Sequence, residues 1–258
     1  MAGQRVATID LDSRQKSLTH WAKRTLTDLE LAVHFSVARA EGAKVHENEA
    51  AEFADKVITA VQHCHFLVID TPPQDSYLMR LAHSIADTLV SPLNDSFLDL
   101  DVLAMVDPVT FAVTEVSHYA EMVRKARRLR RSVDGALTDW VVARNRLSLL
   151  GACVKPIICE GLNELGLRLG FRVMEGFAER AIYRELFPRG LTALDDLEVI
   201  MPCTEPDPLC LIARQEVRTL LDSLRLPLDE RGRRRAAARA QWLASRDNPL
   251  DTHDILDT

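Results

Sequence analysis

Short apolar runs recur along the chain between segments of helical periodicity, and within each run the apolar residues are consecutive instead of alternating. The clearest runs are RVATID at 5–10, FLVID at 66–70, TLVSP at 88–92 and DWVVARN at 139–145, with FRVM and EVIMP less clear. A strand with this pattern is buried on both faces, as happens when helices cover both sides of a parallel sheet. The sequence therefore predicts an α/β fold with a mostly parallel sheet between helical layers.

Helical periodicity fills the intervals between these runs. The predicted helices lie at 49–62, 76–86, 114–131, 177–187 and 208–224. Asp75 or Ser76 is expected to cap the second of them, and SFLD at 96–99 resembles a capping box. Because the chain shows no internal repeat and no Gly/Ser linker, we expect one domain over 1–228. Residues 229–258 are predicted to form a basic helix and then an acidic, mobile tail.

The composition disfavours several classes of protein. Of the 258 residues, 47% are hydrophobic and 27% are charged, which is ordinary for a globular domain. The formal net charge of -6 gives no overall attraction to nucleic acid or to an anionic membrane, so such binding needs a local basic patch. The five cysteines form no CxxC pair, which disfavours a disulfide framework and a cysteine metal site. No apolar stretch approaches the roughly 18 residues of a membrane span, and we expect a cytoplasmic protein.

Polar side chains end four of the apolar runs. They are Asp10, Asp12, Asp70, Asn94, Arg144, Asn145 and Arg146. Ligands of open α/β sheets bind beyond the carboxyl ends of the strands, and carboxylates there can hold Mg²⁺ together with phosphate oxygens. The pattern thus indicates nucleotide chemistry. For any single aspartate, a role as turn former or helix cap is the favoured interpretation, although it weakens for the set as a whole. The run ARNRL is equally typical of a surface turn.

The segment RKARRLRR at 124–131 places six cations within eight residues of a predicted helix. It is either a solvated helix surface or a contact for the phosphates of DNA. The candidate DNA-binding residues are Arg124, Lys125, Arg128, Arg168 and Arg172. A second basic segment, RGRRRAAARAQWL at 231–243, has too few large apolar residues for stable insertion, so we expect no membrane anchor.

Four segments together resemble the ParA/MinD group of deviant-Walker P-loop ATPases, and within it the MipZ-type ATPases that position the division plane. They are VATIDLDSRQ, the stretch from FLVIDTPP to DVLAMVDPVT, DWVVARNRL and YRELFPRGLTALD. The resemblance implies a P-loop NTPase fold with ATP and Mg²⁺ as cofactors, and a homodimer when ATP is bound. It further implies inhibition of FtsZ polymerisation, binding of ParB and of DNA, and a bacterial, nucleoid-associated location.

The resemblance also implies roles for individual residues. Asp12 would orient the attacking water, and Asp10 would support the magnesium and water shell. Asp70, in LVIDTPP, would hold Mg²⁺ largely through water. Asn145 would recognise the adenine edge, with the neighbouring arginines close by. These roles fit phosphoryl transfer, which depends on positioning and charge neutralisation.

Members of this group also carry a strand and a glycine-rich KGGxGK[ST] loop ahead of the first aspartates, and no such loop occurs in residues 1–258. Two explanations stay open. Either the start is misassigned and the natural protein carries the loop upstream, or the chain is a nucleotide-free adaptor that keeps partner binding without ATPase activity. Losing a central strand exposes backbone and apolar surface on a scale comparable with the whole stability of a domain, which favours the first.

Overall fold

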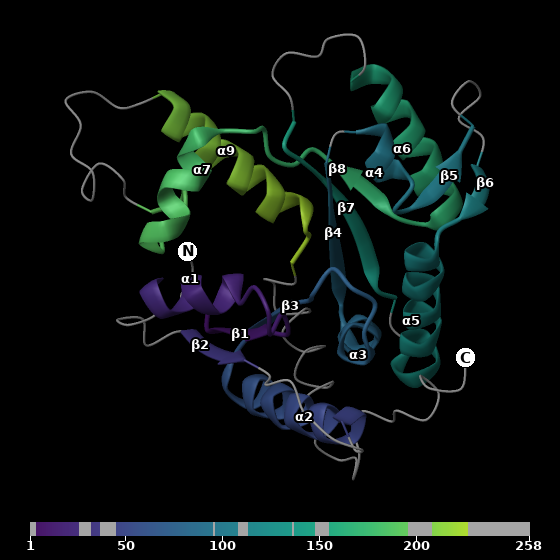
Figure 1. The fold of residues 1–258 in the computed structure, drawn as a ribbon. Helices are drawn as coiled ribbons and strands as arrows, with labels where there is room; N and C mark the ends of the chain where they lie inside the picture. The colour runs from purple at the N-terminus through teal and green to yellow at the C-terminus, as the bar shows by residue number, and fades with distance from the viewer. Residues whose placement is uncertain are drawn as a thin grey trace. The chain divides into compact units, whose positions relative to one another are not determined.

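The structure is a computed structural model that describes residues 4–25, 32–36, 45–94, 96–107, 113–135, 137–147, 155–195 and 208–226 (Figure 1). The chain forms two compact units. The first contains the chain up to Ala82 together with Phe187–Leu191, and the second contains His83–Leu186 and Thr192–Arg225. Each unit has its own parallel sheet and is described by itself.

The first unit is built on a three-stranded parallel sheet in the order β2-β1-β3. Its strands are β1 (Val6–Asp10), β2 (Ala32–Ser36) and β3 (Phe66–Asp70). Helices α1 (Ser17–Thr25) and α2 (Val45–His63) lie on opposite sides of this sheet (Figure 1). Because the central strand β1 is covered on both faces, every residue of it after the first is buried, as its consecutive apolar residues predict.

Strand β3 forms an open edge of this sheet. Within the residues described, β3 pairs with β1 alone, and none of its five residues is buried. Val68, in the middle of the strand, is 50% exposed. An apolar edge strand presents a row of unpaired backbone groups beside exposed apolar side chains, and a further strand commonly covers such an edge.

The second unit is built on another three-stranded parallel sheet, in the order β4-β7-β8. Its strands are β4 (Thr88–Asn94), β7 (Asp139–Asn145) and β8 (Arg172–Met174). The central strand β7 is buried from Trp140 to Arg144. The strand that the sequence shows most clearly as an uninterrupted apolar run is therefore the middle strand of its sheet.

Helices cover both faces of this second sheet. Trp140 and Arg144 contact α5 (His118–Asp134) and α6 (Lys155–Leu169), since the Trp140 ring meets Tyr119 and the Arg144 guanidinium meets Cys159. On the opposite face, Leu220 of α9 (Pro208–Ser223) packs against the cluster of Val141, Ala143 and Met174. Consecutive strand residues point to opposite faces, so β7 is held between two helical layers.

Shorter elements complete the described chain. They are α3 (Tyr77–Ile85), α4 (Phe97–Leu100), an antiparallel hairpin of β5 (Ala104–Val106) and β6 (Val113–Val116), α7 (Ala181–Leu186) and the 3-10 helix η2 (Phe187–Arg189). The predicted cap of α3 is Ser76, whose Oγ accepts a hydrogen bond from the Met79 amide at 3.2 Å. Helix α5 ends at Gly135, which has the left-handed φ of 72° that favours glycine.

The predicted fold class is confirmed, with two corrections to the predicted helices. The helix expected from 114 begins at His118, because Val113–Val116 forms β6 and Ser117 caps the helix. The helix expected from 177 begins at Ala181, because the residues before it pair with the end of β7. The predicted EVIMP strand and the 229–258 tail lie outside the described residues.

Candidate functional site

The three predicted carboxylates come together at the carboxyl ends of β1 and β3. Asp10 lies directly opposite Asp70 in the parallel register. The pairing continues for one residue, since the Leu11 amide donates to the Asp70 carbonyl at 2.9 Å. Asp12 follows at once and acts electrostatically on Asp70. The parallel sheet thus brings together Asp10 and Asp70, which are sixty residues apart in the sequence.

Asp10 is 1% exposed, and protein donors engage both of its oxygens. Its Oδ1 accepts a hydrogen bond from the Asp12 amide at 2.9 Å. Its Oδ2 accepts one from the Thr19 amide at 2.8 Å and another from the Thr19 hydroxyl at 2.7 Å. Asp10 therefore shapes the loop between β1 and α1, which is the turn-forming role that the sequence left open.

Asp12 lies in a tight turn of its own. Its Oδ1 accepts hydrogen bonds from the amides of Arg14 and Gln15 at 2.9 and 3.0 Å. The turn ends at Lys16, a non-glycine residue with a φ of 50°. The Asp12 side chain is half-buried, so its carboxylate combines a fixed backbone anchor with access to solvent.

The surroundings of Asp70 disfavour its ionised form, and a bound cation would favour it. Partial burial raises its pKa above the ordinary value, and the nearby Asp10 and Asp12 raise it further, while the Thr71 amide acts in the opposite direction. Within the described residues, no three His, Cys, Asp or Glu side chains gather closely enough to hold a metal ion. The donor set fits Mg²⁺, which is commonly held by one or two carboxylates together with phosphate and water.

In the second unit, Asn94 and Asn145 lie opposite each other at the carboxyl ends of β4 and β7. Asn94 is exposed and Asn145 is half-buried. The two flanking arginines differ: Arg144 is buried and its Nη1 donates to Cys159 Sγ at 2.8 Å, whereas Arg146 is exposed and has a φ of 50°. Of the two, Arg146 is the one accessible to a ligand.

A second stretch of backbone, residues 176–179 (the strap), fixes the turn at Arg144–Leu147 (the β7 turn). The Phe177 amide donates to the Arg144 carbonyl, the Leu147 amide to the Phe177 carbonyl and the Glu179 amide to the Leu147 carbonyl, at 3.0, 3.0 and 3.1 Å. A Cβ atom at Gly176 would lie 1.4 Å from the Arg144 carbonyl oxygen, so no other residue fits there unless the backbone moves. Sequence reasoning missed the strap, and Gly176 was its only signal.

The basic helix α5 divides its cations between two tasks. Arg130 is 3% exposed and donates to the Ile85 carbonyl and to Asp87 Oδ1, both at 2.6 Å. Arg127 is half-buried and donates to the Gly170 carbonyl at 2.9 Å. These two cations hold the second unit together. The exposed cations are Arg124, Lys125, Arg128 and Arg131, and their spacing places them on one side of the helix.

The two remaining DNA-binding candidates also differ. Arg168 is exposed on α6 and forms an ion pair with Glu164 at 2.8 Å. Arg172 donates to both carboxylate oxygens of Asp139 and to the Ser223 carbonyl. Arg172 therefore joins the start of β7 to the end of α9, and this structural role removes most of its capacity to bind phosphate.

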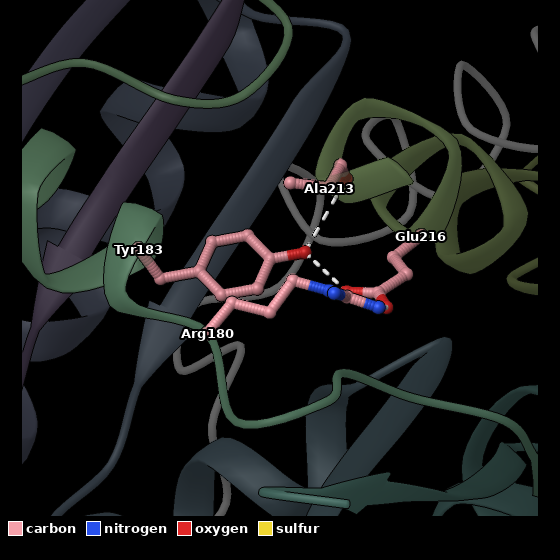
Figure 2. A network of polar contacts seen from close by, with 4 residues as sticks. All are labelled: Arg180, Tyr183, Ala213 and Glu216. Atoms are coloured by element: carbon pink, nitrogen blue, oxygen red, sulfur yellow. Dashed lines mark hydrogen bonds and ion pairs between the residues drawn. The ribbon is translucent and has the colours of Figure 1, made fainter. Parts of the chain in front are cut away.

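A polar network that sequence reasoning did not identify joins α7 to α9. It consists of Arg180, Tyr183 and Glu216, and we call it the α7–α9 clamp. Figure 2 shows the Tyr183 hydroxyl directed at Glu216 and the Ala213 carbonyl, with Arg180 beside the same carboxylate. Tyr183 thus combines a ring contact with Phe177 and a specific hydrogen bond to Glu216.

Parallel strands between helical layers, with aspartates and asparagines at the carboxyl ends, make this an α/β protein of the P-loop NTPase class. The family model described as ATPase MipZ matches residues 1–228, and the chain belongs to this family of division-site positioning ATPases. A search among curated proteins finds no match. In the portion of the chain that the structure describes, no helix is long and apolar enough to cross a bilayer.

Proposed function

We propose that the protein is an ATP-dependent dimerisation switch that regulates where the cell divides, by inhibiting FtsZ polymerisation and by binding ParB and DNA. Membership of the MipZ family supports the division-site role. The observation that carries the nucleotide part is the pairing of Asp10 with Asp70 at the strand ends, beside Asp12. Such an arrangement neutralises and positions phosphoryl groups once a cation is bound.

Each carboxylate has a distinct role in this proposal. Asp70 would hold Mg²⁺ through water, and the ion would supply the positive charge that phosphoryl transfer needs. Asp12, anchored by the amides of Arg14 and Gln15, would orient the attacking water. Asp10 would act indirectly, because it fixes the Asp12 backbone and the first turn of α1.

The β7 turn would recognise the base. Asn145 offers one acceptor and two donor hydrogens at the end of the central strand, the complement of an adenine edge. Arg146 is exposed beside it, and Asn94 is its neighbour across the sheet. Arg144 would contribute through its buried contact with Cys159 and not through the ligand.

The phosphate-binding loop would lie outside residues 1–258 and follow a strand that pairs with the open edge of β3. The edge itself supports this, because β3 is apolar, has no buried residue, and ends beside Asp10 and Asp12, which raise the pKa of Asp70. A parallel strand added there would finish next to Asp70. Lysines of a phosphate loop would then relieve the repulsion that raises the Asp70 pKa.

Non-specific DNA binding would use the exposed side of α5. Arg124, Lys125 and Arg128 are exposed there, although Arg124 shares its charge with Glu121 at 2.7 Å. Cations that contact phosphates release counterions from DNA, so affinity should fall steeply as salt rises. The protein would thus be cytoplasmic and associated with the nucleoid.

Calorimetric titration with Mg·ATP tests the nucleotide role. The chain should be compared with the same chain preceded by the residues encoded upstream in its gene. We expect the longer protein to bind Mg·ATP and the substitutions Asp70→Asn and Asn145→Ala each to weaken binding. Asp222→Asn, an exposed change on α9, serves as the control. If no version binds, the nucleotide role is wrong.

The alternative function is a nucleotide-free adaptor, which the absence of a KGGxGK[ST] loop from residues 1–258 favours. An adaptor would bind ParB or FtsZ equally well with and without ATP. A switch would bind them differently in the two conditions. Pull-down of both partners with and without Mg·ATP therefore separates the two functions.

A further inference from the structure

The strap that holds the β7 turn runs directly into the α7–α9 clamp. Arg180 is the residue after the strap, and its Nε and Nη2 donate to Glu216 Oε1 at 2.9 and 2.8 Å. The two side chains are only 12% and 17% exposed. A charged pair so shielded from water is held more firmly than a surface pair, so the end of the strap is fixed to α9.

An aromatic contact adds a second link between the strap and the clamp. The ring of Phe177 meets the ring of Tyr183 edge to face, with centroids 5.4 Å apart. The Tyr183 hydroxyl donates to Glu216 Oε2 at 2.6 Å, and burial together with this carboxylate raises the pKa of Tyr183, so the hydroxyl stays protonated. Glu216 therefore restrains both ends of the strap, through Arg180 and through Tyr183.

The β7 turn needs such restraint. Arg146 has a φ of 50°, a left-handed conformation that is unfavourable for a residue with a side chain and persists only where the surroundings impose it. The three backbone hydrogen bonds from the strap supply that constraint. If the strap loosened, Arg146 would relax toward an ordinary conformation and the adjacent Asn145 would change direction.

We propose that Glu216 of α9 is a positioning residue for the Arg144–Leu147 turn, which it holds through Arg180, Tyr183 and the strap. The inference rests on the proposed function in one respect only, that this turn contacts the base. The mechanical link stands on contacts within the second unit. It makes α9 part of the machinery that sets the direction of Asn145, although α9 carries no residue predicted to touch a nucleotide.

Hydrogen exchange of the full chain without nucleotide tests the link. Glu216→Gln removes the charge and Tyr183→Phe removes only one hydroxyl, while Glu164→Gln removes an equivalent charge from an exposed ion pair on α6. We expect Glu216→Gln to speed exchange of the Leu147, Phe177 and Glu179 amides roughly tenfold, as the loss of a charged hydrogen bond would. Tyr183→Phe should act in the same direction and more weakly.

The amides in the middle of β7 provide the internal control. Those of Val141 and Val142 should exchange at the original rate in all three variants, because a positioning role is local. Unchanged exchange at Leu147 and Phe177 in both clamp variants would overturn the inference. So would an equal acceleration throughout β7, since this would show a general loss of stability.

Binding of the fluorescent analogues mant-ATP and mant-GTP to the chain preceded by the residues encoded upstream in its gene adds a functional measurement. If Glu216 positions the turn, the preference for mant-ATP over mant-GTP should fall several-fold in Glu216→Gln and stay unchanged in Glu164→Gln. An intact preference despite faster exchange would contradict the inference. If this longer protein without substitutions binds neither analogue, the proposed function fails and the exchange data alone decide the inference.

Discussion

Asp10 and Thr19 are joined by two hydrogen bonds to one oxygen atom. The amide and the hydroxyl of Thr19 both donate to Asp10 Oδ2, at 2.8 and 2.7 Å, and both residues are buried. This pair connects the end of β1 to the first turns of α1. The loop that carries Asp12 is therefore fixed at both ends before any ligand binds.

The first prediction concerns this pair. Thr19→Val keeps the shape of the side chain and removes its donor, so we expect the free energy of unfolding to fall by about 1.5–3 kcal/mol, the range for a hydrogen bond to a charged group. Thr59→Val on α2 is the matched control, because the Thr59 hydroxyl is exposed and donates to the Asp55 carbonyl. Urea denaturation of both variants measures the difference, and equal losses would contradict the prediction.

The second prediction is a dependence of stability on pH. Because the pKa of Asp70 in the folded chain lies above its ordinary value of 3.8, folding disfavours the ionised form. Asp70 therefore lowers stability above its raised pKa, and this cost disappears as the pH falls toward 3.8. We expect Asp70→Asn to raise the melting temperature at pH 7 and to lose that advantage in acid.

Melting curves of the original chain and of Asp70→Asn between pH 7 and pH 4 provide the measurement. Asp222→Asn supplies the control for a simple change of net charge, because Asp222 is exposed in the second unit. If the gain in melting temperature from Asp70→Asn grows as the pH falls, the account of Asp70 is contradicted.

The third prediction separates two arginines of the same basic segment. Arg130→Met leaves the Ile85 carbonyl without this donor and should lower the free energy of unfolding by about 2–3 kcal/mol. Arg128→Met on the exposed side should change it by less than about 0.5 kcal/mol. For DNA binding we expect the opposite order. Arg128→Met should lower the steepness of log affinity against log salt by about 0.9, and Arg130→Met should leave it unchanged.

Urea denaturation and DNA-binding titrations at several salt concentrations check this pair of variants. If Arg128→Met leaves the salt dependence unchanged while Arg130→Met abolishes it without unfolding the protein, the exposed side of α5 is not the DNA contact.

How far the sequence predicted the fold depends on the environment of each segment. The sequence predicts β3 and β7 at their observed limits, because each is a short uninterrupted apolar run. Only β7 is buried as such a run implies, whereas β3 is an exposed edge strand. Residues 114–116, most of strand β6, are predicted as the start of the following helix, because the helical periodicity of that segment extends over them. Only the pairing with β5, a contact between different segments, decides in favour of a strand.

The candidate site was predictable in its residues but not in their partners. The register of two parallel strands places Asp10 beside Asp70, and the position of each after an apolar run implied this. Nothing in the pattern RKARRLRR distinguishes Arg128 from Arg130, because the difference arises from the carbonyl of Ile85 on a separate segment. The strap was missed for the same reason, since its bonds reach back thirty residues or more to the β7 turn.

The fourth prediction concerns the polar contacts inside the second unit. Trp140 is 1% exposed and its Nε1 donates to Ser91 Oγ at 3.0 Å, while the same Oγ lies 2.5 Å from the Tyr119 hydroxyl. Ser91→Ala would leave a buried indole donor without this acceptor and should lower the free energy of unfolding by about 1–3 kcal/mol. Near-ultraviolet circular dichroism should report the altered packing of Trp140. Ser132→Ala, at an exposed position of α5, should leave both the free energy of unfolding and the circular dichroism spectrum unchanged.

The central claim is that the carboxylates at the ends of β1 and β3 take part in binding Mg·ATP. A nitrogen-15 NMR titration with Mg·ATP tests this most directly, on the chain preceded by the residues encoded upstream in its gene and with the amides of Asp12 and Thr71 as reporters. The account predicts that both signals shift with the same dissociation constant. Signals that shift at different ATP concentrations, or no shift of either signal at millimolar ATP, would contradict it.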